Sequence, residues 1–279
     1  MRLIVSSKED EASQNILDQL LNLDWKKIDE WKENPVYKRG DDYIVTVNRH
    51  HIYVDDIDRE IEDLLDIDID HVVFISKHSS EAGIHSLTVH PIGNVGEAKF
   101  GGIDDKLVPA APAEMTAALR TLWRETREQG LESEYDVSFE ATHHGPYLET
   151  PTYYIEIGSD KESWKDERAG KIIADTVMKV RKNYIENDDV VICIGGGHYA
   201  PRYTDLARKN AVSIGHMVPG WGMKYLTRES FKELVEKTPD VKHVYFDRSS
   251  TSGKERRRVK GWAEEEGLSV VRSDDLQNL

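Results

Sequence analysis

The sequence predicts an α/β protein, a three-layer α/β/α sandwich in which helices cover both faces of a mainly parallel, mixed sheet. In the second half of the chain, strand candidates alternate with helix candidates, which is typical of a parallel sheet with both faces covered. Val190–Ile194 is a continuous apolar run, as expected of a strand that is buried on both faces. The first half lacks this regular alternation, so we expect an elaborated N-terminal half.

The N-terminal half is expected to combine short strands with two helices. Ser7 and Asp10 form a capping-box pattern, which predicts a helix that ends near Leu23. A second, short acidic helix is predicted at 57–65, and short apolar runs predict strands at 3–5, 43–47, 52–54, 71–76 and 86–90. The segment 91–111 is rich in Gly and Pro and is therefore expected to be a loop, whose length itself hints at function.

The C-terminal half is expected to follow a βα rhythm. Pro112 is typical of a helix start, and the residues after it form an amphipathic helix. The remaining elements are predicted as strands at 137–140, 153–157, 190–194, 211–214, 243–246 and 268–271, and helices at 164–183, 202–209, 228–237 and 254–266. No repeat or linker is visible. Residues 1–279 are therefore expected to form a single domain, with the loop 91–111 as a possible subdomain division.

Composition excludes several classes of protein. The chain has 52 acidic and 37 basic residues and a formal net charge of −15, which argues against a protein that coats nucleic acids without regard to sequence. Cys193 is the single cysteine, so a disulfide framework and a Cys-rich zinc finger are excluded, and a reducing, cytoplasmic location is expected. No segment approaches the roughly 20 apolar residues of a membrane span, so we expect no membrane partner.

The most informative feature is that histidines follow predicted strands. These residues are His78, His90, His143, His144, His198 and His216. In open α/β sheets the ligand crevice lies beyond the carboxyl ends of the strands, so histidines that are distant in sequence can converge there. We therefore expect these six side chains to share one site. His50, His51, His71 and His243 are expected to be ordinary surface or core residues, and His85 fits either interpretation.

Imidazoles gathered with carboxylates suggest two chemistries. They bind zinc, which prefers nitrogen ligands and activates water, or they act as general acids and bases near neutral pH. Glu140 and Glu156 lie in or beside the same strands and are candidates for ligands, bases or partners of the ligands. No HExxH motif is present, so the sequence alone leaves both chemistries open.

Other polar motifs admit two interpretations each. Gly195–Gly197 follows a buried strand and either offers backbone N–H groups to an oxyanion or phosphate, or simply makes a tight turn. Arg202 either reaches a phosphate or begins a solvated helix. The basic run 254–260 is typical of a solvated helix face and, less often, of a surface that contacts a polyanion. Ser79 and Ser80 lack the GxSxG context of a nucleophile.

At these residues the sequence resembles the D-aminoacyl-tRNA deacylases of the archaeal and plant type. The resemblance extends over nearly the whole chain and rests on Ser76–Ser80 (SKHSS), Leu87–His90 (LTVH), Glu140–Pro146 (EATHHGP), Glu156–Gly158 (EIG), Gly195–Arg202 (GGHYAPR after the first Gly) and Gly215–His216. It implies a zinc-dependent monomer with a phosphorylase/hydrolase-like fold. It also implies hydrolysis of the ester that joins a D-amino acid to the 3′ acceptor end of tRNA.

The resemblance directs the mechanism that we expect. Zinc would be held by some of His78, His90, His143, His144, His198, His216 and Glu156, and it would activate the attacking water. Glu140 or Glu156 would take the proton of that water. His143, His144 and His198 are also expected to be catalytic, and the N–H groups of Gly196 and Gly197 would stabilise the oxyanion. Lys77, Ser79 and Arg202 are expected to bind substrate; Lys77 stands where Arg is common in the family.

Two alternatives from other classes stay open. The chain could be a zinc hydrolase of another small ester, peptide or phosphoester, or a non-enzymatic RNA-binding protein.

If tRNA is the substrate, the net charge needs a different interpretation, because a local group of basic residues can bind RNA on a protein that is acidic overall. Arg120, Arg124 and Arg127 follow each other at helical spacing and predict, with Arg181–Lys182 and Arg256–Arg258, a basic strip beside the crevice.

Overall fold

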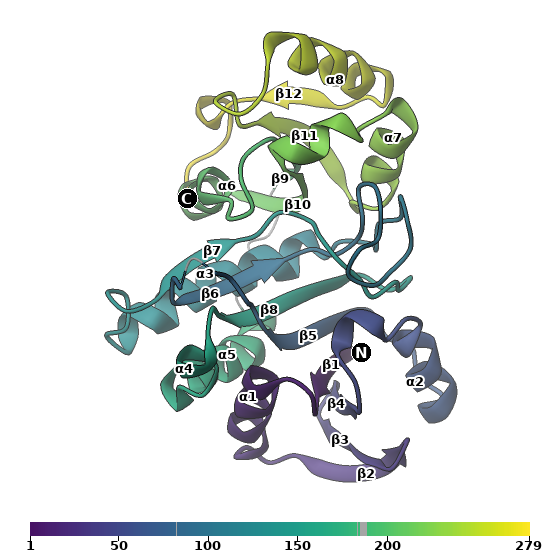
Figure 1. Ribbon diagram of the computed structural model, residues 1–279, viewed down its shortest axis with the longest axis vertical. Coiled ribbons are helices and arrows are strands. Elements are labelled where there is room, and N and C mark those ends of the chain that lie inside the picture. The colour runs from purple at the N-terminus through teal and green to yellow at the C-terminus, as the bar shows by residue number, and fades with distance from the viewer. Residues whose placement is uncertain (82, 183, 185–188) are drawn as a thin grey trace.

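The computed structural model describes residues 1–81, 83–182, 184 and 189–279 and contains two sheets (Figure 1). The larger sheet has eight strands in the order β2-β3-β4-β1-β5-β8-β6-β7. In chain order these strands are β1 (Arg2–Ser7), β2 (Lys26–Trp31), β3 (Asn34–Arg39), β4 (Asp42–Val47), β5 (His71–Lys77), β6 (Ser86–His90), β7 (Asp136–Phe139) and β8 (Thr152–Gly158). The smaller sheet has the order β10-β9-β11-β12, built from β9 (Asp189–Ile194), β10 (Val212–Val218), β11 (Val241–Phe246) and β12 (Ser269–Val271).

Helices cover both faces of the sheets, as the sequence predicted. They are α1 (Glu11–Leu21), α2 (Ile57–Leu65), α3 (Pro112–Glu128), α4 (Lys161–Trp164), α5 (Glu167–Lys179), α6 (Pro201–Lys209), α7 (Arg228–Glu236) and α8 (Gly253–Glu265). One apolar core joins α1, α3, α5 and α6 to strands of both sheets. A second core lies under α2 on the opposite face of the large sheet, and a third lies between the small sheet and α7 and α8 (Figure 1). The mixed α/β class is therefore confirmed.

The sheets are mainly parallel, and the exceptions position the site. β1 pairs in parallel with β4 and β5, and β5 pairs in parallel with β8, whereas β6 runs antiparallel to β8 and carries β7 parallel to itself. All neighbouring strands in the small sheet are parallel. Strand direction thus reverses near one edge of the large sheet, between β8 and β6.

Several predicted boundaries are wrong for local reasons. The helix that begins after residue 10 is capped by the side chain of Asp10, which accepts the Ser13 N–H, rather than by Ser7. The segment around 52–54 forms a single 3-10 turn, η1 (His51–Tyr53), not a strand. The helix predicted at 164–183 is divided, because Asp166 caps a new helix at Glu167; its expected end at 183 lies outside the described residues.

Two strands escaped prediction altogether. β2 and β3 form an antiparallel hairpin at the edge of the large sheet, and five of the six residues of β2 are exposed. Its sequence, Lys26–Trp31, therefore shows no alternation of apolar and polar residues that would indicate a strand. The loop 91–111 is confirmed, since it contains only isolated bridges and no helix or strand. Among the helices that the structure describes, none combines the length and apolar composition of a membrane-spanning helix.

Candidate active site

A cluster of histidines and glutamates lies on one face of the large sheet, near its polarity reversal. Register places Ser76 of β5 and Thr88 of β6 on either side of Glu156 of β8. Because alternate residues of a strand face the same side, His78 and His90 share the face of Glu156. The neighbours Ile155 and Ile157 face the apolar core on the opposite side. The period of the strands thus brings these three side chains together.

Two loops complete the cluster from the same side. Glu140, His143 and His144 follow β7, and His198 follows β9 of the small sheet. The backbone N–H of Ala141 donates to the carbonyl of His198 at 2.8 Å, and Glu140 forms an isolated bridge with Tyr199. These main-chain contacts attach the two loops to each other, so residues from both sheets enter one site.

The convergence differs from the one that we expected. We expected histidines at the carboxyl ends of parallel strands to meet at one sheet edge. β6 and β7 run opposite to β8, however, so their carboxyl ends do not lie at the edge where β5 and β8 end. His90 sits opposite Tyr154, well inside β8. The side chains therefore meet over the face of the sheet, and the small sheet supplies His198 from beside it.

Glu140 lies at the centre of the cluster and is completely buried. Its two carboxylate oxygens lie 3.1 Å from Nδ1 of His78 and 2.9 Å from Nε2 of His198. Glu156 is also buried, and its Oε2 lies 3.6 Å both from Nδ1 of His78 and from Nε2 of His90. Oε2 of Glu140 also lies 3.6 Å from Nε2 of His143. Glu140 thus faces three imidazole rings and Glu156 two, an arrangement that offsets the cost of burying a carboxylate.

Three of the histidines have the orientation of metal ligands. The Nδ1 atoms of His90, His143 and His144 lie 3.1, 2.8 and 2.6 Å from the carbonyl oxygens of Pro91, Ala141 and Gly145. A carbonyl only accepts, so each Nδ1 carries a proton, and a ring in its neutral form keeps a lone pair on Nε2. Burial lowers the pKa of His90, but its contact with Glu156 outweighs burial and raises it, so this ring gives up a proton when it binds a metal. Ligand atoms of these three rings lie within 4.8 Å of one another. This donor set, with its backbone partners, suits zinc.

In two further groups of the cluster, the possible ligand atoms also lie within 4.8 Å of one another. They are His78, Glu140 and His198, and His90, Glu140 and Glu156. Nε2 of His90 and both carboxylate oxygens of Glu140 are buried and have no hydrogen-bond partner with good geometry among the described residues. Since buried polar atoms are normally paired, these atoms favour a site for an ion or an ordered water.

The pKa values divide the cluster into two kinds of group. Burial lowers the pKa of His78, but its close contacts with the carboxylates of Glu140 and Glu156 outweigh burial and raise the pKa to about 11. Burial lowers the pKa of His144 to about 4 and that of His143 well below its usual range. Burial raises the pKa of Glu156, but its contacts with His78 and His90 lower it to about 2. Glu156 is therefore ionised at neutral pH, and His143 and His144 are neutral.

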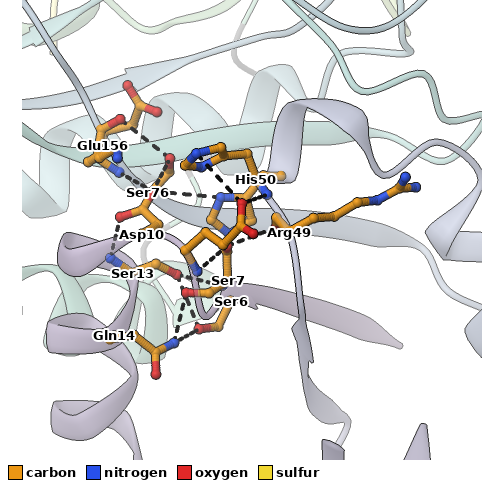
Figure 2. A network of polar contacts seen from close by, with 12 residues as sticks. Ser6, Ser7, Asp10, Ser13, Gln14, Arg49, His50, Ser76 and Glu156 are labelled. Atoms are coloured by element: carbon orange, nitrogen blue, oxygen red, sulfur yellow. Dashed lines mark hydrogen bonds and ion pairs between the residues drawn. The ribbon is translucent and has the colours of Figure 1, made fainter. Parts of the chain in front are cut away.

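The cluster opens into a cavity of about 310 Å³. Predicted residues in its wall are Lys77, His78, Ser79, His143, His144, Glu156 and His198. Asp10, Ser76 and Phe100 also line this wall and were not predicted, and neither were His50 and His51, which we expected to be ordinary residues. Asp10 accepts the Ser76 hydroxyl at 3.0 Å and the Lys77 N–H at 2.9 Å, as Figure 2 shows around the start of α1. The position of Asp10 just before a helix predicts only a capping residue, and its contacts with Ser76 and Lys77 could not be expected from the sequence.

Tyr199 was also missed. Its hydroxyl lies 3.0 Å from Nε2 of His78, so His78 is held between this hydroxyl and the carboxylates on its other nitrogen. Tyr199 follows His198 directly in the motif that carries the resemblance. That adjacency was the one signal in the sequence that pointed to it.

His216 does not join the cluster. β10 continues to Val218, so His216 lies inside a strand rather than after one. It is fully buried, with Nδ1 3.1 Å from the hydroxyl of Thr142 and Nε2 3.0 Å from the carbonyl of Val108. Both ring nitrogens are therefore occupied by the fold, and the prediction of a metal ligand at this position is wrong.

The glycine turn and Arg202 also lie apart from the cavity. The N–H of Gly196 donates to the hydroxyl of Ser250, and neither Gly196 nor Gly197 lines the cavity. An oxyanion role for Gly196 is thus contradicted, because its N–H already has a partner. Arg202 pairs with Asp247 at 3.3 Å and lines a separate surface pocket. The glycine turn after β9 is bonded to the loops that follow β10 and β11 in the same small sheet.

The predicted basic strip is only partly present. Arg120 is not a free surface cation, because its guanidinium donates to the backbone carbonyls of Ala207, Asn210 and Val212. Arg127 is stacked on Trp123 of its own helix. The side chain of Lys182 lies outside the described part of the structure. The basic residues of α8 are described below.

The mixed α/β fold and the buried imidazole–carboxylate cluster beside a cavity are those of a hydrolytic enzyme. The model of the family described as D-aminoacyl-tRNA deacylase matches residues 65–271. A Pyrococcus abyssi protein named D-aminoacyl-tRNA deacylase is 39% identical to this chain, and the match covers 98% of this chain and 100% of that protein. A Methanococcoides burtonii protein of the same name is 40% identical, and the match covers 99% of this chain and 57% of that protein. The chain therefore belongs to the D-aminoacyl-tRNA deacylase family.

The fold is shared with a solved structure. A crystal structure of a conserved protein of unknown function superposes with a TM-score of 0.92 at 31% identity, over 99% of this chain and 96% of that one. The chain spans about 57% of the length of the Methanococcoides burtonii relative and the whole of the Pyrococcus abyssi relative. The resemblance inferred from the sequence motifs is thus confirmed.

Proposed function

We propose that this protein hydrolyses the ester bond of D-aminoacyl-tRNA and releases the free D-amino acid and tRNA. One observation carries the proposal beyond family membership. His78, His143, Glu156 and His198 lie in the motifs that resemble the deacylases, and the fold gathers them around one cavity from two sheets, with Glu140 of the same motifs buried behind them. The cavity, of about 310 Å³, suits an aminoacyl group joined to a ribose.

We propose zinc as the cofactor, held by His90, His143 and His144. One ligand atom of each ring lies within 4.8 Å of the other two, and the Nδ1 atoms lie against backbone carbonyls, which leaves Nε2 of each ring for a metal. Nε2 of His90 is buried without a hydrogen-bond partner among the described residues. Bound zinc acts as a Lewis acid and lowers the pKa of water to near 7. This ligand set leaves the rest of the cluster to the protein's own proton transfers.

The glutamates take different roles in this proposal. Glu156 lines the cavity and is ionised, so its carboxylate accepts the proton of the water that attacks the ester carbonyl carbon. The bond between that carbon and the ribose oxygen then breaks, and the proton passes from Glu156 to the ribose oxygen. Glu140 is covered by the cluster and fixes the rings of His78 and His198 from behind.

Substitution of the two glutamates tests this division. We expect Glu156→Gln to lower kcat by about 10²- to 10⁴-fold with little change in KM, because it removes the proton acceptor. We expect Glu140→Gln to retain more activity, because an amide oxygen still accepts from one imidazole. Steady-state deacylation at several pH values measures both. Equal losses in the two variants would contradict separate roles.

The reaction itself is tested with D-tyrosyl-tRNA and L-tyrosyl-tRNA side by side. We expect release of D-tyrosine only, loss of activity after exhaustive chelation, recovery on adding zinc, and about one zinc per chain or more by elemental analysis. Hydrolysis of neither ester, together with turnover of small peptides or phosphoesters, would indicate another zinc hydrolase. Full activity in metal-free protein would refute the zinc proposal but not the deacylase, and tRNA binding without turnover would indicate an RNA-binding protein.

We also propose that the chain acts as a single catalytic domain and as a monomer in the cytoplasm, where aminoacyl-tRNA is made. One apolar core spans both sheets, and the site takes residues from each, which supports the single domain. Cys193 is a buried free thiol, as suits a reducing compartment. Light scattering of the purified protein measures the oligomeric state.

A further inference from the structure

We propose that the single-stranded 3′ end of tRNA reaches the cavity along one continuous surface, which we call the 3′-end track. It consists of three exposed aromatic residues, one of which lines the cavity, and of basic residues at the start of α8 and beside it. These residues are Phe100, Trp221 and Tyr225, followed by Lys224, Arg248, Lys254 and Arg257. The inference rests on the proposed function and names the surface that holds its RNA substrate.

The aromatic part of the track is unusually exposed. Phe100 is 64% exposed, Trp221 54% and Tyr225 41%, although large apolar side chains of this fold are mostly buried. Phe100 also lines the wall of the cavity. Aromatic side chains on which unstacked bases can lie are the usual means by which proteins hold single-stranded RNA. Exposed rings beside a cavity for a nucleotide-linked ester therefore favour bases as their partners.

Contacts of the loop 91–111, which carries Phe100, place it beside the segment that carries Trp221 and Tyr225. The loop 91–111 lies beside α7 (Figure 1), where the N–H of Leu107 donates to Glu233. Earlier in this loop, the ring of Tyr225 packs so closely on Gly96 that a Cβ there would lie 3.1 Å from the ring. Trp221 and Lys224 lie in the 3-10 turn Gly220–Lys224, which begins with the N–H of Gly220 donating to Gly196.

The same turn leads to the basic part of the track. The N–H of Gly196 donates to Ser250, in the loop that follows β11 and precedes α8. Arg256 of α8 donates to the carbonyls of Arg248 and Thr251, and Arg258 donates to the carbonyl of Met223 in the turn. The start of α8 is thus attached directly to the turn that carries Trp221.

The charge of this region is opposite to that of the whole molecule. Residues 247–260 contain six basic and two acidic residues in a chain with a net charge of −15. Arg248, Lys254 and Arg257 are exposed, and within the described part of the chain none of them forms an ion pair with an acid. Such cations bind phosphates and release counterions, which supplies affinity without base recognition. Phosphates on α8 and bases on the aromatic rings fit a single strand better than a duplex, whose bases are stacked inside.

Binding of uncharged RNA tests the track independently of catalysis. The probes are an acceptor-stem hairpin that ends in single-stranded CCA and the same hairpin without that overhang. We expect wild-type protein to prefer the overhang, and Trp221→Ala to weaken binding of the overhang hairpin about tenfold, with little effect on the trimmed hairpin. We expect Lys254→Glu with Arg257→Glu to weaken binding at least tenfold and to reduce the salt dependence of log Kd by about 0.7 per lost contact.

Lys26→Glu is the matched control, because Lys26 is an exposed lysine on β2, at the far edge of the large sheet. It should bind the hairpins as the wild type does. Wild-type affinity in the Trp221 and Lys254/Arg257 variants would overturn the track, even if the protein deacylates D-tyrosyl-tRNA. Conversely, if the variants lose RNA binding as expected but the wild-type protein does not deacylate D-tyrosyl-tRNA, only the proposed function would be overturned. Equal affinity for a polyglutamate peptide would refute the assignment to RNA.

Discussion

His90→Ala is expected to lower kcat/KM for D-tyrosyl-tRNA by about 10³-fold and to reduce the zinc content of the purified protein. His90 is the member of the cluster that belongs both to the triad of histidines and to the group with Glu140 and Glu156. Its Nδ1 is tied to the carbonyl of Pro91, so its Nε2 is aimed at the other ligands and at Glu156. Loss of this ring removes a proposed zinc ligand and leaves Glu156 with one imidazole fewer.

His243→Ala is the control for this experiment. His243 lies on β11 of the small sheet, pairs with Ser269 and Asp189, and does not line the cavity. It should keep wild-type activity and zinc content. Because His90 is fully buried, His143→Ala serves as a second test at a more exposed ring, and unfolding of both proteins is followed by circular dichroism. Normal zinc content and activity in His90→Ala and His143→Ala would refute the assigned ligands.

Arg2→Ala is expected to destabilise the fold by about 3–5 kcal/mol, because it leaves a buried carboxylate without its cation. Arg2 is only 1% exposed. Its guanidinium lies 3.2 Å from Glu114 on α3 and 2.9 Å from Asp42 on β4. Tyr153 and Tyr184 also donate to Glu114, but hydroxyl groups cannot neutralise its charge. Urea denaturation followed by fluorescence measures the free energy of unfolding.

Two companion variants separate the lost charge pair from the lost side chain. Adding Glu114→Gln to Arg2→Ala is expected to recover part of the stability, since it removes the unpaired charge. Arg59→Ala removes an exposed arginine that pairs with Glu149 on the surface, and no measurable change is expected. If Arg2→Ala were as stable as Arg59→Ala, the buried ion pair would not hold α3 on the large sheet.

Most buried elements could be predicted from the sequence, because burial on both faces leaves a continuous apolar run. Val190–Ile194 and His71–Ser76 are examples, and both are strands in the structure. β2 could not be predicted in the same way, since an exposed edge strand has no apolar face to reveal it. The division between α4 and α5 could not be predicted either. It depends on Asp166, which caps the start of α5, and an Asp inside a longer helical pattern does not by itself indicate a new helix.

The site was predicted in its residue types and less well in its geometry. His78, His90, His143, His144 and His198 do converge with the two glutamates. His216 was expected by the same argument, yet its ring is occupied by Thr142 and Val108 inside β10. Asp10 and Tyr199 were missed, because a helix cap and a lone tyrosine carry no distinctive spacing.

The sequence by itself determined the α/β class, the family and the donor atoms of the cluster, because these follow from periodicity and from residue identity. Only the tertiary structure decided which donors meet. The reversal of strand direction between β8 and β6 moves the site from an edge of the sheet to its face, where alternate residues of three strands point to the same side. The second sheet then adds His198, 42 residues beyond Glu156 in the chain. Such a meeting depends on long-range strand pairing, which local sequence patterns do not encode.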